Sequence, residues 1–243
     1  AVVAPQIAFK TRGRQPSVDL RAGCSEIEDQ GKLGSCNACS VTGALEFQLR
    51  KNGEKNELSI LFHYYNSRRL SRMENEDSGL MSTHAIAGAL AFGICEDKLF
   101  PYDITTFKNE PSQDCYNSAR AFEGVQYARV EGGVEAAKVM LSDGVPLVVG
   151  FDIPGGYYDG AAQTGRMPKL GEVPEGNAGG HSMLVVGYDD ADQTWLVRNS
   201  WGKDWADKGY VRIPYDTFAR FVWSDDLWAI GKLEALGDVT RLG

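Results

Sequence analysis

Long apolar runs and an excess of basic residues are both missing from this sequence of 243 residues. A helix that crosses a bilayer needs about 20 consecutive apolar residues, and no stretch approaches that length, so we expect no membrane partner. The chain has 25 Lys and Arg against 33 Asp and Glu, a net charge of −8. Because phosphate binding needs a concentrated basic face, nucleic acid is excluded as a partner. The one local basic cluster, Arg68, Arg69 and Arg72, is interpreted as a solvated helix face.

Histidine is scarce, with three residues, and cysteine occurs an odd number of times, five. An odd count leaves at least one thiol unpaired within the chain. Cys95 and Cys115 flank a loop and are the best candidates for a disulfide, whereas Cys24 is left unassigned. Whether that disulfide forms stays open at this point, and its presence would favour a secreted or periplasmic location.

The first half of the chain has helical patterning and the second half has strand patterning. Apolar spacing and capping residues predict helices over 35–51, from 59 onward and over 86–92. Short runs rich in Val, Ile, Tyr and Trp predict strands over 146–153, 182–188, 194–198 and 209–213, with a long loop over 155–180. This order indicates an α+β protein of two lobes, with a cleft where the lobes meet.

Cys36 lies where the first predicted helix begins. Unpaired N–H groups at a helix start favour negative charge, and a cysteine nucleophile has to become a thiolate. The residues just before it, 29–35, form a turn that can bring the side chain of Gln30 back beside the thiol. An amide there, together with the backbone N–H of Cys36, can donate to the oxyanion of a tetrahedral intermediate. Cys36 and Gln30 are therefore candidate catalytic residues.

His181 is the best candidate for the proton partner of Cys36. His63 and His84 lie in helical stretches, where histidine is more often packed or on the surface, whereas His181 follows two glycines and opens an apolar strand. The next strand runs into Asn199, whose amide oxygen can emerge beside His181. Together these residues form a nucleophile, base and orienter arrangement.

Three sequence blocks resemble the papain-like cysteine peptidases, in particular their bacterial members. The blocks are 29–40 (DQGKLGSCNACS), 180–188 (GHSMLVVGY) and 199–213 (NSWGKDWADKGYVRI), and the resemblance extends from residue 18 to at least residue 213. It implies the papain-like fold, with a helical N-terminal lobe, a β-rich C-terminal lobe and the active-site cleft between them. It also implies that Gln30, Cys36, His181 and Asn199 are the oxyanion glutamine, nucleophile, base and orienting asparagine, and that Trp201 shields the bond between His181 and Asn199.

The resemblance further implies the partners and the substrate pocket. We expect a monomeric hydrolase that needs no cofactor and no metal, that acts on peptides or proteins as an endopeptidase, and that protein inhibitors can block. Leu80 and Met81 on one wall, with Gly150, Gly179 and Gly180 opposite, are expected to hold the side chain two residues before the cleaved bond and to favour an apolar residue there. The chain departs from the family's usual cysteine signature at Leu33 and Asn37, so the disulfide beside the active site cannot form.

Two other kinds of function are weighed against a peptidase. Cys36 and Cys39 form a Cys-x-x-Cys pair, but a thioredoxin-like motif should follow the first strand of an alternating β-α pattern, and none precedes this pair. A zinc site lacks a second ligand pair with suitable spacing. Cys39 is therefore expected to point into the core. An inactive papain fold kept as a binding module would have lost one of the site residues, and none is lost.

The first 17 residues precede the region of resemblance. Their two prolines favour extended backbone, so we consider both a propeptide remnant that covers the cleft and an ordinary disordered terminus. The expected organisation is an N-terminal extension over 1–17 and a peptidase domain over 18–243. Within that domain, the helical lobe spans about 18–125 and the β lobe about 126–243.

Overall fold

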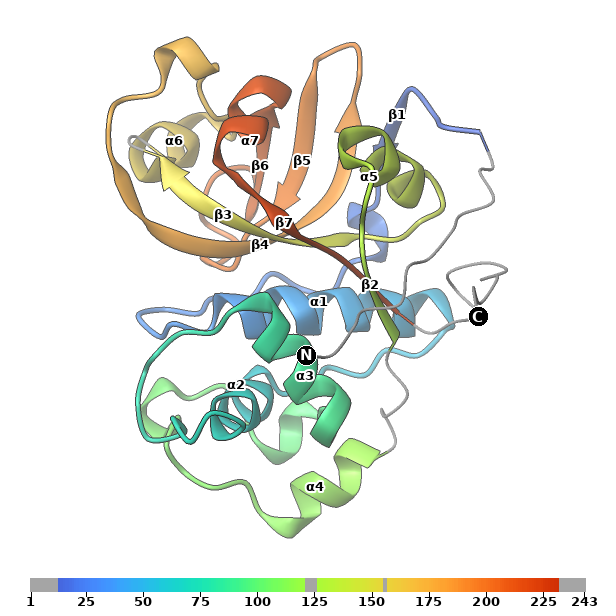
Figure 1. The fold of residues 1–243 in the computed structure, drawn as a ribbon. Coiled ribbons are helices and arrows are strands. Elements are labelled where there is room, and N and C mark those ends of the chain that lie inside the picture. Colours follow the sequence, from blue (N-terminus) through green and yellow to red (C-terminus); the bar gives the residue numbers. More distant parts are fainter. Residues whose placement is uncertain (1–12, 121–125, 155–156, 232–243) are drawn as a thin grey trace.

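The computed structural model describes residues 13–120, 126–154 and 157–231. These residues form two lobes, one built on an antiparallel sheet and the other on helices, with α1 running along their boundary (Figure 1). The helices are α1 (Cys36–Lys51), α2 (Ile60–Arg69), α3 (Ser82–Phe92), α4 (Gln113–Ala119), α5 (Gly133–Ser142), α6 (Ala162–Thr164) and α7 (Tyr215–Phe221). The strands are β1 (Ser17–Asp19), β2 (Gln126–Arg129), β3 (Leu147–Pro154), β4 (Asn177–Asp189), β5 (Thr194–Arg198), β6 (Tyr210–Pro214) and β7 (Val222–Gly231). The α+β fold with two lobes is thus confirmed.

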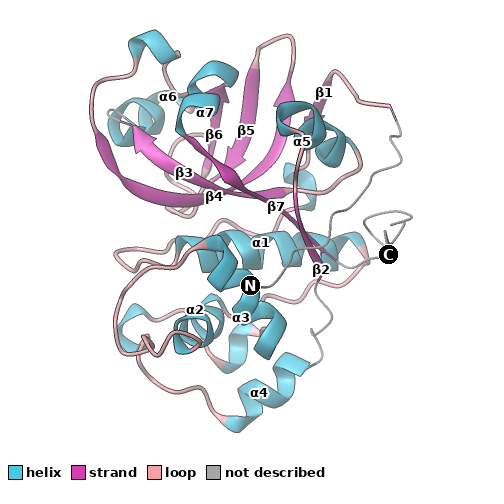
Figure 2. Cartoon of the chain, in the orientation of Figure 1, coloured by secondary structure: helices cyan, strands magenta, loops and turns pink. Residues whose placement is uncertain are grey.

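The sheet contains seven strands among the described residues, in the order β2-β7-β3-β4-β5-β6, with β1 paired to β4 (Figure 2). Successive side chains of a strand point to opposite faces. On β3, Val149 packs into the core of the β lobe, whereas Val148 packs against the helical lobe. Both faces of this strand are covered, which explains why its sequence is an almost unbroken apolar run.

Helix α1 is buried nearly all round, from Asn37 to Leu49. It packs against β4 on one side and against α2 and α3 on the other. A helix covered on all sides does not need one polar face, and its small residues, such as Ala38 and Gly43, let the neighbouring elements approach closely. Because α1 is held by both lobes, the residue at its start lies at the lobe boundary.

The predicted helices are confirmed, with shifts at their ends. Ser59 caps α2 through its hydroxyl, which accepts the backbone N–H of Phe62. Helix α3 starts at Ser82, four residues before the predicted start at Ile86, and ends at Gly93, whose φ of 66° is a conformation that glycine adopts without strain. Because α3 opens with polar residues, the apolar spacing that predicts a helix does not mark its beginning.

The predicted strands are also confirmed, and strand 194–198 has the predicted bounds. Strand β4 begins at Asn177, so the last four residues of the predicted loop over 155–180 belong to a strand instead. This extension could not be predicted, because glycines lack the side chains whose alternation indicates a strand. The rest of that region contains a π-helical turn (Tyr157–Ala161), helix α6 and a 3-10 turn (Leu170–Glu172).

Residues 13–17 of the N-terminal extension lie on the β lobe. Arg14 pairs with Asp190 and Glu135, and Ser17 opens β1, which pairs with the end of β4. The hypothesis that the extension covers the cleft concerns mainly residues 1–12, which lie outside the described residues. Within the described ranges, no helix is both long and apolar enough to cross a membrane.

The interpretation of the arginine cluster as a solvated face is wrong for Arg68. This side chain is 1% exposed, stacks on the ring of Tyr64 and donates to the carbonyl oxygens of Glu74, Glu76 and Phe107. The guanidinium therefore supplies donors to a loop that has no secondary structure of its own. These hydrogen bonds from Arg68 hold the loop that leads to the cleft wall.

Candidate active site

Cys36 is the first residue of α1 and faces the cleft between the lobes. Burial raises the pKa of its thiol, while the backbone N–H groups of Ser182, Asn37 and Cys36 itself act in the opposite direction. The N–H groups at a helix start have no partner within the helix and can stabilise a negative sulfur. The thiol is thus partly shielded from bulk water and lies against several backbone donors.

The turn before Cys36 is held by hydrogen bonds to the helical lobe. Asp77 accepts the backbone N–H of Gly34 at 2.9 Å and also the hydroxyl of Tyr64. The hydroxyls of Ser35 and Tyr102 lie 2.6 Å apart, and that of Tyr102 donates to the backbone oxygen of Gln30 at 3.1 Å. These contacts fix where α1 begins and therefore where its first side chain points.

Gln30 is buried, and its side-chain amide is oriented at both ends. The hydroxyl of Ser200 donates to Oε1 over 2.5 Å, and Nε2 donates to the backbone oxygen of Leu33 over 2.9 Å. An amide nitrogen carries two hydrogens, so a second donor of Nε2 is left for another acceptor. The backbone N–H of Gln30 also donates to Ser200 at 2.9 Å, which ties this turn to the segment after β5.

His181 lies on β4, Asn199 directly follows the neighbouring strand β5, and the two side chains form one hydrogen bond. Nε2 of His181 is 2.7 Å from Oδ1 of Asn199, and the backbone N–H of Ser200 donates to the same oxygen at 2.9 Å. Burial lowers the pKa of His181 to about 4, against the opposing effect of Asn199. The ring of Trp201 stacks on His181, with centroids 4.9 Å apart and planes at 29°. The indole therefore covers one face of the imidazole beside this bond.

The two sides of this site are joined by a buried ion pair. Arg198, the last residue of β5, pairs with Glu28 at 2.7 Å and donates to the backbone oxygen of Ser25 at the same distance. Glu28 in turn accepts the N–H of Gly202 through its backbone oxygen. The segment that carries Gln30 is thereby locked to the segment that carries Asn199.

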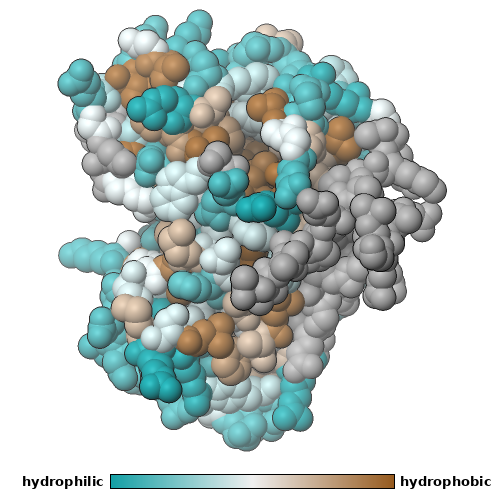
Figure 3. All heavy atoms as spheres, viewed as in Figure 1, coloured by the Kyte–Doolittle hydropathy of each residue, from teal (hydrophilic) through white to brown (hydrophobic). Residues whose placement is uncertain are grey.

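Cys36 and His181 line the same cleft, a cavity of about 420 Å³. The surface is hollowed where the two lobes meet (Figure 3). Of the predicted pocket residues, Leu80, Met81 and Gly180 line this cleft. Gly150, Gly179 and Trp201 are not among its described lining residues, and the cleft face of Gly150 is covered by Trp223.

Sequence reasoning missed several lining residues, which are Arg68, Met73, His84 and Trp223. No local motif marks them. Trp223 comes from β7, a strand that the pattern search did not find, and it faces the cleft only because of the strand's register with β3. His84, expected to be packed or on the surface of a helix, lies exposed on α3, on the side that forms the cleft wall.

Asn37 and Leu33, the two positions that depart from the usual cysteine signature, make other contacts with their surroundings. Asn37 donates from Nδ2 to the backbone oxygen of Leu80 at 2.6 Å and accepts the hydroxyl of Ser82 at 2.8 Å. Leu33 is buried in a small apolar cluster with Cys39. Hydrogen bonds and apolar packing therefore hold the cleft wall to α1, where a disulfide cannot form.

The remaining cysteines are buried or partly buried, and the structure has all five as free thiols. Cys39 is 3% exposed and packs in the core as expected, and burial raises its pKa well above the usual value. This does not suit a redox pair with Cys36, which needs an accessible thiolate. Burial, together with the neighbouring Cys115, raises the pKa of Cys95 to about 12. The two candidates for a disulfide are therefore neighbours in the fold, with both thiols reduced.

The sequence and fold were compared with known proteins. A family profile described as papain family cysteine protease matches residues 15–221. An uncharacterized peptidase C1-like protein of Acanthamoeba polyphaga mimivirus is 32% identical over 96% of this chain and 78% of its own length. Mouse cathepsin S is also 32% identical, over 85% of this chain and 60% of its own length. The chain thus spans less than two thirds of that relative.

Solved structures give the same fold. Xylellain, a cysteine protease from Xylella fastidiosa, superposes with a TM-score of 0.82 at 29% identity and covers 94% of both chains. A cysteine protease of Carica candamarcensis, solved in complex with E-64, has a TM-score of 0.62 at 21% identity, with 90% of this chain and 99% of that chain covered. The second likeness concerns the fold alone.

Proposed function

Since the chain belongs to the papain family of cysteine proteases and is a peptide-bond hydrolase, we propose that Cys36 is its nucleophile and His181 its proton partner. The observation that carries this proposal is the position of both side chains in one cleft, with His181 hydrogen-bonded to Asn199 at 2.7 Å. An amide oxygen only accepts, so Nε2 of His181 carries the hydrogen and Nδ1 is free to take a proton. This is the tautomer that a general base needs.

In the proposed reaction, the thiol proton moves to Nδ1 of His181 and the sulfur attacks the peptide carbonyl carbon. Burial opposes a charge on either group alone. Proton transfer creates two opposite charges at once, however, and their attraction offsets part of that cost. The tetrahedral intermediate then collapses to a thioester on Cys36, as His181 returns the proton to the leaving amine. Water, deprotonated by His181, hydrolyses the thioester and releases the acid.

We assign oxyanion stabilisation to Gln30 and to the backbone N–H of Cys36. The support is that the amide of Gln30 is held at both ends, by Ser200 and by the backbone of Leu33, and keeps one hydrogen of Nε2 unused in these contacts. A donor that is already oriented does not have to reorganise when the oxyanion forms, which makes its contribution large. Asn199 and Trp201 act through His181, the first by orienting the ring and the second by covering it.

We further propose that the enzyme is an endopeptidase that prefers an apolar residue, such as Leu, Val or Phe, two positions before the cleaved bond. Leu80 and Met81 supply an apolar wall, and 52% of Met81 is exposed and thus open to contact by a substrate. We retain the proposed organisation of a peptidase domain over 18–243, with its substrate and any protein inhibitor bound between the two lobes.

A fluorogenic dipeptide library tests this proposal, with E-64 titration to count active sites. The expected result is hydrolysis that stops when one equivalent of E-64 is bound, with faster turnover of peptides that carry an apolar residue at the second position. Hydrolysis that survives complete thiol blockage would contradict the mechanism, and a preference for acidic residues at that position would contradict the assignment of the wall.

A further inference from the structure

Strand β7 contains an insertion opposite the cleft. Val149 of β3 pairs with Leu227 and Phe151 pairs with Val222, so two steps along β3 correspond to five along β7. The residues between, 223–226, are therefore extruded from the ladder as a large bulge. Bulges of this kind redirect side chains, and this one turns Trp223 onto the face of the sheet that forms the cleft.

Trp223 lies over two glycines on neighbouring strands. A Cβ atom added at Gly180 would be 2.9 Å from Cη2 of the indole, and one added at Gly150 would overlap its ring at Cε3. Neither glycine has the positive φ that would require this residue type for its backbone. The indole therefore explains the absence of a side chain at Gly180, and the indole together with the carboxylate of Asp226 explains it at Gly150.

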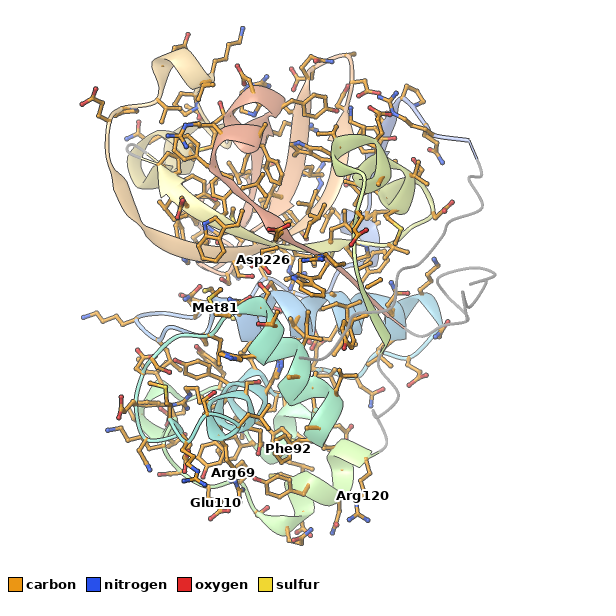
Figure 4. All side chains as sticks on the ribbon, in the orientation of Figure 1. Arg69, Met81, Phe92, Glu110, Arg120 and Asp226 are labelled. Carbon is orange, nitrogen blue, oxygen red and sulfur yellow. The ribbon has the colours of Figure 1, made fainter. Side chains whose placement is uncertain are left out.

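The bulge is fastened to the opposite wall of the cleft by Asp226. Its carboxylate is 8% exposed, accepts the hydroxyl of Ser82 at 2.7 Å and accepts Nε1 of Trp228 at 2.6 Å. Ser82 is the first residue of α3, and its hydroxyl oxygen also lies 2.8 Å from Oδ1 of Asn37, the neighbour of Cys36. Asp226 and Met81 lie at the lobe boundary, as Figure 4 shows. This chain of contacts makes the position of Trp223 a fixed part of the site.

A second cavity lies in the β lobe, and Leu147 and Val185 in its lining face away from Gly150 and Gly180 across the sheet. It measures about 470 Å³ and is lined largely by apolar side chains of the β lobe, among them Leu147, Trp195, Phe218 and Leu227. Among the residues that the structure describes, Trp223 is the one that lines both this cavity and the cleft. Its indole lies on the cleft face of the sheet, over Gly150 and Gly180.

We propose that Trp223 sets the size limit of the substrate side chain that enters the cleft beside Gly180. This inference rests on the proposed peptidase function and refines it. The indole occupies the space above Gly150 and Gly180, so a short or branched aliphatic side chain fits against it, whereas an aromatic one competes for the same volume. Within the apolar class, Val and Leu are therefore favoured over Phe and Trp.

The test compares kcat/KM for four fluorogenic dipeptides that differ only in Val, Leu, Phe or Trp at the second position before the cleaved bond. The native enzyme should prefer Val or Leu over Phe and Trp by roughly tenfold or more, the range that a filled apolar pocket supplies. Trp223→Ala vacates the space over Gly180 and should raise the ratio of the Phe to the Val substrate by at least about tenfold. Trp223→Phe should lie between the two enzymes.

A compensating variant keeps the test independent of folding defects. In Trp223→Ala combined with Gly180→Val, a new side chain grows from β4 into the vacated space, because among the described residues the indole is the only group that a Cβ at Gly180 would meet. The preference for Val over Phe should therefore return. Thermal melting establishes that each variant is folded. E-64 titration counts the active sites, so that the rates of the variants are compared per active site. If Trp223→Ala changes kcat/KM for all four substrates by the same factor, the indole does not set the size limit and the inference is overturned. If the native enzyme hydrolyses none of them, the proposed function fails instead.

Discussion

His181 donates from Nε2 to Oδ1 of Asn199 over 2.7 Å, and that oxygen is held in place by the backbone N–H of Ser200 at 2.9 Å. Two donors on one oxygen settle which end of the amide faces the ring, and they leave Nδ1 of His181 as the nitrogen available to a proton. The bond thus selects both the orientation and the tautomer of the imidazole.

Asn199→Ala should be milder than His181→Ala. The first substitution loosens the ring but leaves its nitrogen in the cleft, so kcat should fall by about ten- to a hundredfold, as when other partners that orient a histidine are removed. The second deletes the proton acceptor and should cost about a hundred- to ten-thousandfold. Steady-state kinetics on one dipeptide substrate measure both. Equal losses would contradict the separate roles.

His181→Ala should also slow the alkylation of Cys36 by iodoacetamide. Burial raises the pKa of this thiol, so without a neighbouring base the thiolate is rare near neutral pH. We expect at least a tenfold lower labelling rate at about pH 6.5, followed by mass spectrometry of the labelled peptide. Cys39→Ala is the control and should label at the native rate. An unchanged rate in His181→Ala would mean that the helix start alone makes the thiolate.

Gln30→Ala should lower kcat by on the order of a hundredfold, because its amide donates to charge that develops only in the transition state. KM should change little. Ser200→Ala is the matched control: it removes the hydroxyl that holds Oε1 but keeps the donor, so its loss should be clearly smaller. A native rate in Gln30→Ala, with the fold intact by thermal melting, would remove Gln30 from the mechanism.

Glu46 should make the protein less stable as pH rises. Burial and, to a lesser extent, Glu28 raise the pKa of this side chain to about 8 from 4.5. The folded state then binds the proton of Glu46 more tightly than the unfolded state does. The contribution of Glu46 to the free energy of unfolding is therefore most favourable below about pH 4.5 and is lost as pH rises toward 8. The full effect is on the order of 5 kcal/mol.

Glu46→Gln removes this titration and preserves an oxygen that can accept the backbone N–H of Leu58. Urea unfolding should therefore show a gain in the free energy of unfolding at pH 8 and little change at pH 4.5. His63, whose pKa burial lowers to about 4, acts in the opposite direction between about pH 6.5 and 4 and is present in both proteins, so it cancels in the comparison. An equal difference at both pH values would contradict the shift.

Much of the fold could be predicted because its signals are local. Strand 194–198 is a short run of residues that favour strands, Ser59 caps the helix that follows it, and Cys36 stands at a helix start after a glycine-containing turn. The four candidate catalytic residues each lie at such a boundary, so their order in the sequence sufficed to select them.

What could not be predicted depends on contacts between distant segments. Arg68 is buried because carbonyl groups from two loops converge on it, and no helical pattern encodes that convergence. Trp223 enters the cleft because β7 slips against β3, which the sequence of neither strand shows alone. Gly150 appeared to open a pocket, yet the indole of Trp223 fills the space above it.

The central claim, that Cys36 is the nucleophile, is tested most directly by comparing Cys36→Ala with Cys39→Ala. Both variants remove one thiol from the same helix, but Cys36 faces the cleft and Cys39 is buried in the core. Hydrolysis of a fluorogenic dipeptide and covalent labelling by E-64 should both vanish in Cys36→Ala and persist in Cys39→Ala. Activity that survives in Cys36→Ala and is lost in Cys39→Ala would contradict the account.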